Sequence, residues 1–248
     1  IKKGFRSGRR EFIKSIGALS VGLAIGLDAK ANIVNISKKR GIIDLEINPF
    51  VIIDTAGNIT IVNPRPDMGQ GTFHSVPALI AEELEVDIAA VKIVQSDGKS
   101  KYGSQTSGGS TSIRNLWVPL RKAGAAAKEM LIKAAAQKWK VAESQCYAAD
   151  AKVFLKNNNK SLSYGELVED ASKLGIPANP VLKDPANFKI IGKDIKRKDV
   201  PLKVTGNAVY GLDVDVSGMV YASVLHSPML FGKIIAVDDS AALKIPGV

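Results

Sequence analysis

Alternating apolar and polar positions predict strands in the first half of the chain. Residues 50–62, FVIIDTAGNITIV, hold two such runs on either side of the turn residues Ala56, Gly57 and Asn58, which is the pattern of a β-hairpin. Residues 91–97, VKIVQSD, alternate over a shorter length and predict another strand. We therefore expect a β-sheet in this part of the chain.

A period of three to four residues predicts a helix between these strands. The apolar side chains at helical spacing in residues 72–84 are Phe73, Val76, Leu79, Ile80 and Leu84. A proline is tolerated in the first turn of a helix, and Pro77 lies in this stretch. We therefore expect the helix to begin between His74 and Val76.

The longest helix is predicted after residue 112. One face carries Ile113, Leu116, Trp117, Leu120, Gly124, Ala127, Leu131, Ala134 and Ala135. The Ala-rich stretch 123–139 has high helix propensity, and Pro119 either kinks the helix or marks its effective start. We interpret Trp117 and Trp139 as packing residues rather than as rings that stack on a cofactor.

Residues 140–248 predict mixed structure. Residues 151–171 have the pattern of a short strand, an Asn-rich turn and a short helix in which Ser163 and Glu166 form a capping box. Residues 175–188 and 192–203 have the composition of loops with a solvated basic face, and from Gly206 the pattern again favours antiparallel strands. The prediction is an α+β fold with a mixed sheet and long helices, and a domain boundary near residues 200–205.

The N-terminal segment has the organisation of an export signal. A basic stretch precedes the apolar residues 16–27, and Ala29-Lys30-Ala31 offers an A-x-A cleavage site. Within it, Arg9-Arg10-Glu11-Phe12-Ile13-Lys14 is similar to a twin-arginine signal, with Ile13 in place of the usual Leu. We expect export to the periplasm or association with the membrane through residues 1–31, and a linker over 32–49. An ordinary secretory signal, or a basic start with no address, is the alternative.

Charge and cysteine content narrow the class of function. The net charge is +10, but residues 1–40 hold ten Lys and Arg against two acidic residues, which leaves +2 for residues 41–248. This body has no basic stripe interleaved with aromatic residues, so we do not expect nucleic acid as a partner.

Cys146 is the only cysteine, which excludes an iron–sulfur cluster held by this chain alone. We interpret Cys146 as a small packing residue. Because His74 and His226 have no ligands at suitable spacing, we predict no protein-built metal site.

Two glycine-rich stretches precede the two predicted helices. They are MGQG at 68–71 and TSGGSTS at 106–112. Glycine permits a positive φ and close approach to a ligand, and the amides at a helix N-terminus favour an anion such as a phosphate. Plain helix capping is the alternative, because neither stretch is a P-loop or a dinucleotide fingerprint.

The order of these motifs resembles the molybdopterin-binding large subunit of the molybdenum hydroxylases, the xanthine dehydrogenase and aldehyde oxidase superfamily. The resemblance is strongest to the isoquinoline 1-oxidoreductase β-subunit type. It rests on PRPDMGQGTFHSVPALIAEELEVD, then on GGSTSIRNLWVPLRKAG, and it extends over residues 50–248. It implies a cofactor-binding segment over 50–200. It also implies that 201–248, with KVTGNAVYGLDVDVSGMVYASVLHSP, begin an α/β hammerhead domain.

The resemblance implies a cofactor and the residues that bind it. The cofactor is molybdopterin cytosine dinucleotide with molybdenum. The matching positions are Gly69, Gln70, Gly71 and Thr72 at the pterin, and Gly108, Gly109, Ser110, Thr111 and Ser112 at the dinucleotide phosphates. It also implies hydroxylation of an N-heteroaromatic or aldehyde carbon with oxygen from water, with a glutamate as base. Electrons would pass through 2Fe-2S clusters on a small partner subunit to an acceptor such as a cytochrome.

No catalytic residue is predicted within these 248 residues. The base of the family lies further along the chain, and we interpret Glu82 and Glu83 as solvated or capping residues of the first helix. We therefore expect these residues alone to be inactive. Two other functions stay open: a non-catalytic protein that binds or assembles the molybdenum cofactor, and an exported α+β binding module whose glycines only cap helices.

Overall fold

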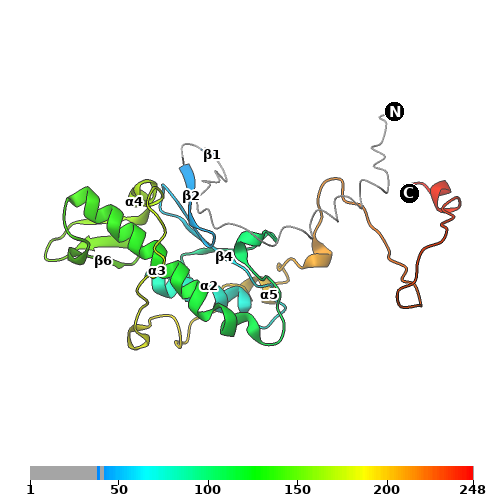
Figure 1. Ribbon diagram of the computed structural model, residues 1–248, viewed down its shortest axis with the longest axis horizontal. Coiled ribbons are helices and arrows are strands. Elements are labelled where there is room, and N and C mark those ends of the chain that lie inside the picture. The colour runs from blue at the N-terminus through cyan, green and yellow to red at the C-terminus, as the bar shows by residue number, and fades with distance from the viewer. Residues whose placement is uncertain (1–37, 40–41, 248) are drawn as a thin grey trace. The chain divides into compact units, whose positions relative to one another are not determined.

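A computed structural model describes residues 38–39 and 42–247, shown in Figure 1. The predicted export signal over 1–31 lies outside the described residues. The chain divides into two units, with the division between Pro201 and Leu202. The first unit contains both helices and sheets, which confirms the α+β prediction.

The larger sheet has five strands in the order β1-β2-β3-β4-β5. The strands are β1 (Lys38–Lys39), β2 (Ile42–Asn48), β3 (Val51–Asp54), β4 (Ile59–Asn63) and β5 (Lys92–Gln95). All neighbours pair antiparallel except β4 and β5, which are parallel. The β3–β4 hairpin confirms the prediction for 50–62, and the Asp54 carboxylate accepts hydrogen bonds from the amides of Ala56 and Asn58 in its turn.

The predicted linker over 32–49 is wrong for its last part, because residues 42–48 form strand β2. The segment IIDLEIN alternates, and its Leu45 and Ile47 side chains are buried in the core. Both side chains point to the same face of the strand because that face recurs every second residue.

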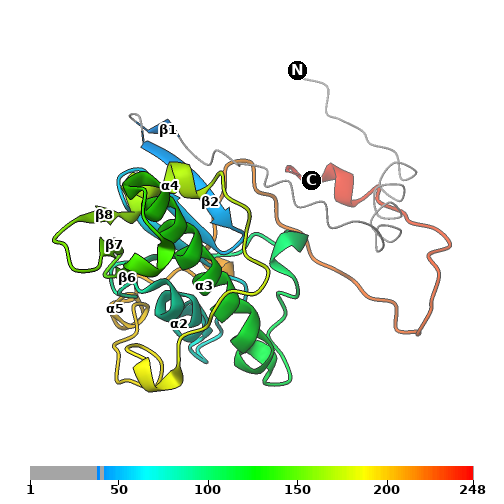
Figure 2. The same cartoon turned by 60° about the vertical axis from the view of Figure 1, so that its left-hand side comes forward.

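Three helices cover the larger sheet. They are α2 (Thr72–Leu84), α3 (Thr111–Trp139) and α4 (Tyr164–Ala171), and Figure 2 shows α3 and α4 in front of β2. Helices α2 and α3 pack closely at Gly124, where a Cβ atom would lie 2.5 Å from the carbonyl oxygen of Ile80. Trp117 and Trp139 pack against the core, as predicted. Within the described residues no helix has the length and apolarity needed to cross a bilayer.

Both long helices begin earlier than expected. Helix α2 starts at Thr72 rather than between His74 and Val76, so Pro77 lies inside it. The preceding loop holds the first turn, because Asp67 accepts a hydrogen bond from the amide of Phe73 at 2.8 Å. Helix α3 starts at Thr111, so Pro119 does not mark its start.

A smaller antiparallel sheet follows α3. Its strands are β6 (Cys146–Ala149), β7 (Lys152–Leu155) and β8 (Ser161–Ser163). Ser163 and Glu166 form the predicted capping box of α4, and Cys146 is buried, as its interpretation as a packing residue required. The remaining short helices are η1 (Ser100–Tyr102), η2 (Glu143–Gln145), η3 (Pro185–Asn187), α5 (Val200–Val204), η4 (Gly211–Asp213) and η5 (Ala242–Lys244).

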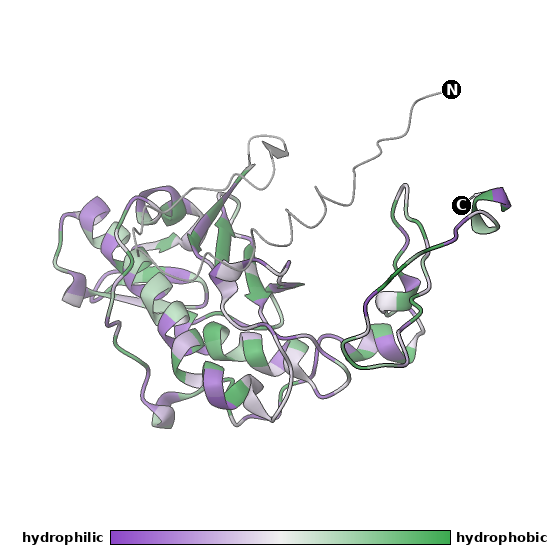
Figure 3. Ribbon diagram, turned by 45° about the vertical axis from the view of Figure 1, so that its right-hand side comes forward, coloured by the Kyte–Doolittle hydropathy of each residue, from purple (hydrophilic) through white to green (hydrophobic). Residues whose placement is uncertain are grey.

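The strands predicted from Gly206 onward are absent from the second unit as far as residue 247. Its apolar stretches, green in Figure 3, are exposed, and Leu212, Leu225 and Phe231 are fully so. A hairpin is marginal in water unless one face packs against something. Sequence alternation alone therefore does not produce strands here, and the hammerhead assignment for 201–248 stays a prediction.

Candidate functional site

The topology brings the two glycine-rich stretches to one edge of the sheet. The last residues of the parallel strands, Asn63 of β4 and Gln95 of β5, are paired in register. A first loop, residues 64–71, leads from β4 into α2, and a second loop, residues 103–110, precedes α3. In open sheets with parallel strands, ligands bind at the carboxyl ends of the strands.

Hydrogen bonds connect the two loops at two points. The carbonyl oxygen of Pro66 accepts from Gln70 Nε2 at 3.0 Å, from Thr72 Oγ1 at 3.0 Å and from Ser107 Oγ at 2.9 Å. Next to it, Arg65 Nη1 donates to the carbonyl of Thr106 and to the hydroxyl of Ser104. Two segments far apart in sequence thus form one structure.

The first loop satisfies most of its polar groups internally. Asp67 accepts from the amides of Gly69 at 2.7 Å and Phe73 at 2.8 Å, so a carboxylate already occupies the N-terminal end of α2. The Gln70 side chain donates to Pro66 and accepts from the amide of Met68 at 2.5 Å. Gly69 and Gly71 have φ values of 104° and 93°, which favour glycine.

The second loop is open to solvent at the start of α3. Gly108, Gly109 and Ser110 are exposed, and Gly109 and Ser110 have φ values of 56° and 55°. Among the described residues, the Ser110 side chain makes no capping hydrogen bond, and the first turn of α3 has no acidic residue. Amides at the start of this helix therefore remain available for an anion.

A strap formed by residues 181–199 connects the two ends of α2. Near the helix start, Arg197 donates to Asp199 at 3.0 and 2.5 Å, and a Cβ atom on Gly71 would lie 3.3 Å from Arg197 Nη1. His74 lies in this region, and burial lowers its pKa although the charge of Asp199 opposes the shift. Among the described residues its Nδ1 is one of two buried side-chain atoms without a hydrogen-bond partner.

The interpretation of Glu82 and Glu83 as solvated or capping residues is wrong, because their exposed fractions are 1% and 0%. Glu83 pairs with Arg121 Nε at 2.7 Å, and Glu82 pairs with Lys183 Nζ at 2.7 Å. Glu82 also accepts from the backbone amides of Lys189, Ile190 and Ile191. Burial alone would raise the pKa of Glu82, but these hydrogen bonds outweigh it and lower the pKa below its ordinary value. Glu83 also accepts from the backbone amide of Lys183 at 2.8 Å, so both carboxylates fasten the strap to α2.

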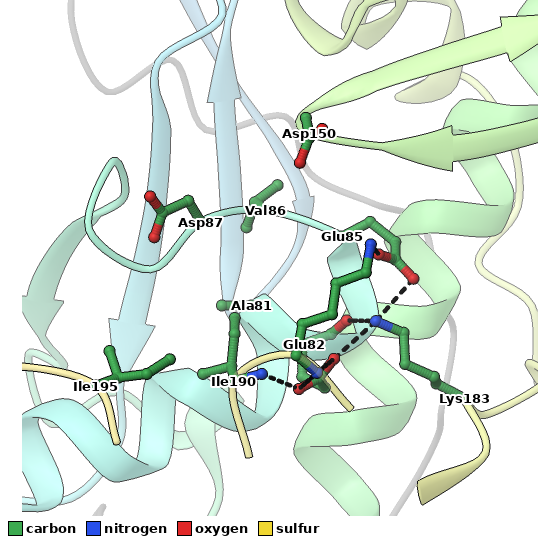
Figure 4. Close-up of a pocket in the computed structure, with 10 residues that line it drawn as sticks. Ala81, Glu82, Glu85, Val86, Asp87, Asp150, Lys183, Ile190 and Ile195 are labelled. Carbon is green, nitrogen blue, oxygen red and sulfur yellow. Dashed lines mark hydrogen bonds and ion pairs between the residues drawn. The ribbon is translucent and has the colours of Figure 1, made fainter. Parts of the chain in front are cut away.

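A cavity of about 310 Å³ lies at this C-terminal end of α2 and is shown in Figure 4. Its charged lining residues are Glu82, Glu85, Asp87, Asp150, Lys183 and Lys189. Lys183 lies 2.7 Å from both Glu82 and Glu85, and Lys189 lies 3.1 Å from Glu85. The two lysines pair with Glu82 and Glu85, which leaves Asp87 and Asp150 as further carboxylates of the lining, and no residue of the glycine loops lines the cavity.

The nine predicted binding residues form two groups around the junction of the loops. Gly71 and Thr72 are buried and support the first loop, Gly69 and Gln70 are exposed, and the five residues from Gly108 to Ser112 are exposed or half-buried at the start of α3. Their role in binding stays a prediction. Sequence reasoning did not single out Arg65 or Asp67, although both lie between the predicted strand and MGQG. The parallel pairing of β4 with β5 would have drawn attention to them.

Comparison with known proteins gives consistent matches. The family model of the molybdopterin cofactor-binding domain matches residues 10–219. The beta subunit of isoquinoline 1-oxidoreductase from Brevundimonas diminuta is 30% identical, over 98% of this chain and 36% of that protein. The membrane-bound aldehyde dehydrogenase (pyrroloquinoline-quinone) of Gluconacetobacter polyoxogenes is 32% identical, over 77% and 25%. A subunit of nicotinate dehydrogenase from Pseudomonas putida is 27% identical, over 82% and 18%. The chain thus spans between 18% and 36% of the length of these relatives.

Proposed function

The chain belongs to the molybdopterin cofactor-binding domain family, and on this premise we propose that it is the cofactor-binding part of the large subunit of an exported molybdenum hydroxylase. The observation that carries the proposal is the junction of the two glycine loops at the carboxyl ends of β4 and β5. The family match supports cofactor binding by this chain, and the geometry of the loops supports these residues as the binding site.

The residues at the junction fit a phosphate-bearing cofactor. The start of α3 offers amides and the hydroxyls of Ser110 and Ser112, with no acidic residue in the first turn, and the Thr111 hydroxyl donates to the carbonyl of Gly108 at 2.7 Å. The exposed glycines of the second loop leave open space, because no atom lies within 4 Å of a Cβ built on Gly108. The second loop would hold the phosphates of molybdopterin cytosine dinucleotide, and the first loop would hold the pterin. When bound, the cofactor supplies the chemistry that transfers oxygen from water to carbon and removes two electrons.

The proposed substrate is an N-heteroaromatic compound or an aldehyde. The names of the relatives support this, since isoquinoline and nicotinate are N-heteroaromatic and the third relative is an aldehyde dehydrogenase.

An iron–sulfur small subunit would take the electrons and pass them to an acceptor such as a cytochrome. These 248 residues have one cysteine, Cys146, and it is buried, so they do not hold an iron–sulfur cluster by themselves. Residues 1–31 would direct export.

A non-catalytic protein that binds or assembles the cofactor is the competing proposal. Glu82 and Glu83 are buried in ion pairs and unavailable as bases, which agrees with both proposals, because the base of the enzyme would lie further along the chain. The two proposals differ in the coding sequence that they require downstream of residue 248. A Gly-rich loop that contains a Glu in that region supports the enzyme, whereas a stop codon immediately after residue 248 supports the assembly protein.

Metal and nucleotide analysis of the protein purified from its native host tests cofactor binding. We expect molybdenum and a cytidine nucleotide that is released on denaturation. The absence of both would refute the proposal. Release of a quinone instead would support the cofactor that the name of the aldehyde dehydrogenase relative contains.

The double variant Gln70→Ala with Gly109→Val tests the location of the site. We expect loss of bound molybdenum with the circular dichroism spectrum retained, because one change removes an amide side chain and the other places a branched side chain at a φ of 56°. The matched control is Gln137→Ala with Gly175→Val, two exposed positions away from the loops. Unchanged molybdenum content in the first variant would contradict the site.

A further inference from the structure

Within the described residues, a buried cation lies between the two loops without a carboxylate partner. The exposed fraction of Arg65 is 2%, and its backbone is fixed by Asn63, whose side chain accepts from the Arg65 amide at 3.2 Å and donates to its carbonyl at 2.6 Å. The guanidinium reaches the second loop through Nη1, which donates to Ser104 Oγ and to the carbonyl of Thr106. Arg65 is thus held in place at both ends.

The charge of Arg65 lacks the acidic partner that Arg121, the other buried cation of the described residues, has in Glu83. Arg121 pairs with Glu83, Lys183 with Glu82 and Glu85, and Arg197 with Asp199. No ion pair among residues 38–39 and 42–247 includes Arg65. Burying a charge is costly unless it is paired, so an uncompensated guanidinium indicates a missing anion.

The hydrogen bonds of Arg65 are incomplete as well. In the described residues its Nε is buried without a partner, and the hydrogen bonds of the guanidinium use only Nη1. A guanidinium has five N–H donors, and the edge formed by Nε and Nη2 matches two oxygens of a phosphate. The neighbouring carboxylate of Asp67 is bonded to the amides of Gly69 and Phe73.

We infer that Arg65 binds a phosphate group of the cofactor and that this anion neutralises its buried charge. The inference rests on the proposed function and adds a residue to its site. Arg65 lies at the junction that contains the predicted phosphate-binding second loop, and its contact with Thr106 would make the position of that loop depend on the ligand. The phosphate belongs either to the pyrophosphate of a dinucleotide or to a single terminal phosphate.

Titration calorimetry of the 248-residue chain with inorganic pyrophosphate, inorganic phosphate and cytidine 5′-diphosphate tests this inference. We expect wild-type protein to bind, and Arg65→Met to bind about 10-fold or more weakly, because a charge-assisted fork is lost. Lys133→Met is the control, since it removes the same charge from an exposed position on α3, and its affinity should change by less than about 2-fold. Tighter binding of pyrophosphate and cytidine diphosphate than of phosphate identifies a dinucleotide, and equal binding identifies a terminal phosphate.

The outcomes separate this inference from the proposed function. Equal affinities of Arg65→Met and wild type would overturn the inference and leave cofactor binding intact. Failure of the wild type to bind any of the three anions would also overturn it, while molybdenum content of the native protein still tests the proposed function on its own. If Arg65→Met does not fold, the anion affinity of Arg65→Lys tests the inference instead. It keeps the charge but not the fork, and we expect it to bind about 3-fold or more weakly, whereas wild-type affinity would refute the role of the fork.

Discussion

The two loops are both rich in glycine, but the first is closed and the second is open. The first loop is closed: Asp67 occupies the start of α2, both ends of the Gln70 side chain are bonded, and Gly71 is buried. The second loop is open: Gly108, Gly109 and Ser110 are exposed at the start of α3. Asp67 makes the difference, because a carboxylate within the loop satisfies the helix amides that a ligand would otherwise bind.

This difference assigns separate tasks to the loops. The closed loop is a rigid support whose own bonds fix its shape, and the open loop presents donors to an anion. Glycine content alone therefore does not identify a phosphate site. The neighbouring acidic residue has to be considered together with the glycines.

The largest loss of stability is expected from Gly71→Val in the first loop. The φ of 93° disfavours a branched side chain, and the new Cβ would lie 3.3 Å from Arg197 Nη1. We expect a loss of about 2 to 3 kcal/mol in the free energy of unfolding, measured in urea. The matched change Gly108→Val in the open loop meets no atom within 4 Å and has no positive φ, so it should cost under about 0.5 kcal/mol. Equal losses at the two positions would contradict the distinction between the loops.

A smaller effect is expected from Asp67→Asn. The variant removes the negative charge that faces the amides of Gly69 and Phe73, and we expect a loss of about 1 kcal/mol that shrinks at high salt. Asp97→Asn is the control, because Asp97 follows β5 as Asp67 follows β4, but its ion pair with Lys99 is exposed. Exposed pairs contribute little, so this change should cost under about 0.5 kcal/mol. A larger loss for Asp97→Asn than for Asp67→Asn would contradict the role of Asp67 in closing the first loop.

The smallest effect is expected from Ser110→Gly in the open loop. Ser110 has a φ of 55°, a conformation that glycine adopts without a Cβ penalty. We expect a gain of up to about 0.5 kcal/mol in unfolding free energy, because relief of strain exceeds the added freedom of the unfolded chain. A clear loss of stability would mean that the Ser110 side chain supports the loop, and the second loop would then not be open.

Local structure was predictable where neighbouring residues determine it. The β3–β4 hairpin depends on the turn at residues 55–58, and the cap of α4 depends on Ser163 and Glu166, three positions apart. The start of α2 was misplaced because Asp67, outside the helix, holds its first turn. The strands expected from Gly206 onward did not form because their apolar side chains have no packed face in the described chain.

The candidate site was predictable in its motifs but not in its chemistry. The glycines were identified, whereas Arg65 became visible only through its burial and its contact with Thr106. Glu82 and Glu83 were misjudged because their partners, Arg121 and Lys183, lie far away in sequence. Periodicity shows which positions face an apolar core, but it contains no information about a distant segment that covers a polar face.

The carbonyl of Pro66 has one more donor than it needs. A carbonyl oxygen has two lone pairs, and this one accepts from Gln70, Thr72 and Ser107. One donor can leave without exposing an unsatisfied acceptor. Of the three donors, Gln70, which belongs to the first loop, is the exposed one. The Gln70 side-chain amide can therefore donate its hydrogen bond to an arriving ligand instead of to Pro66, at little enthalpic loss. The closed loop thus already contains a donor for the ligand, and binding only changes the acceptor of that donor.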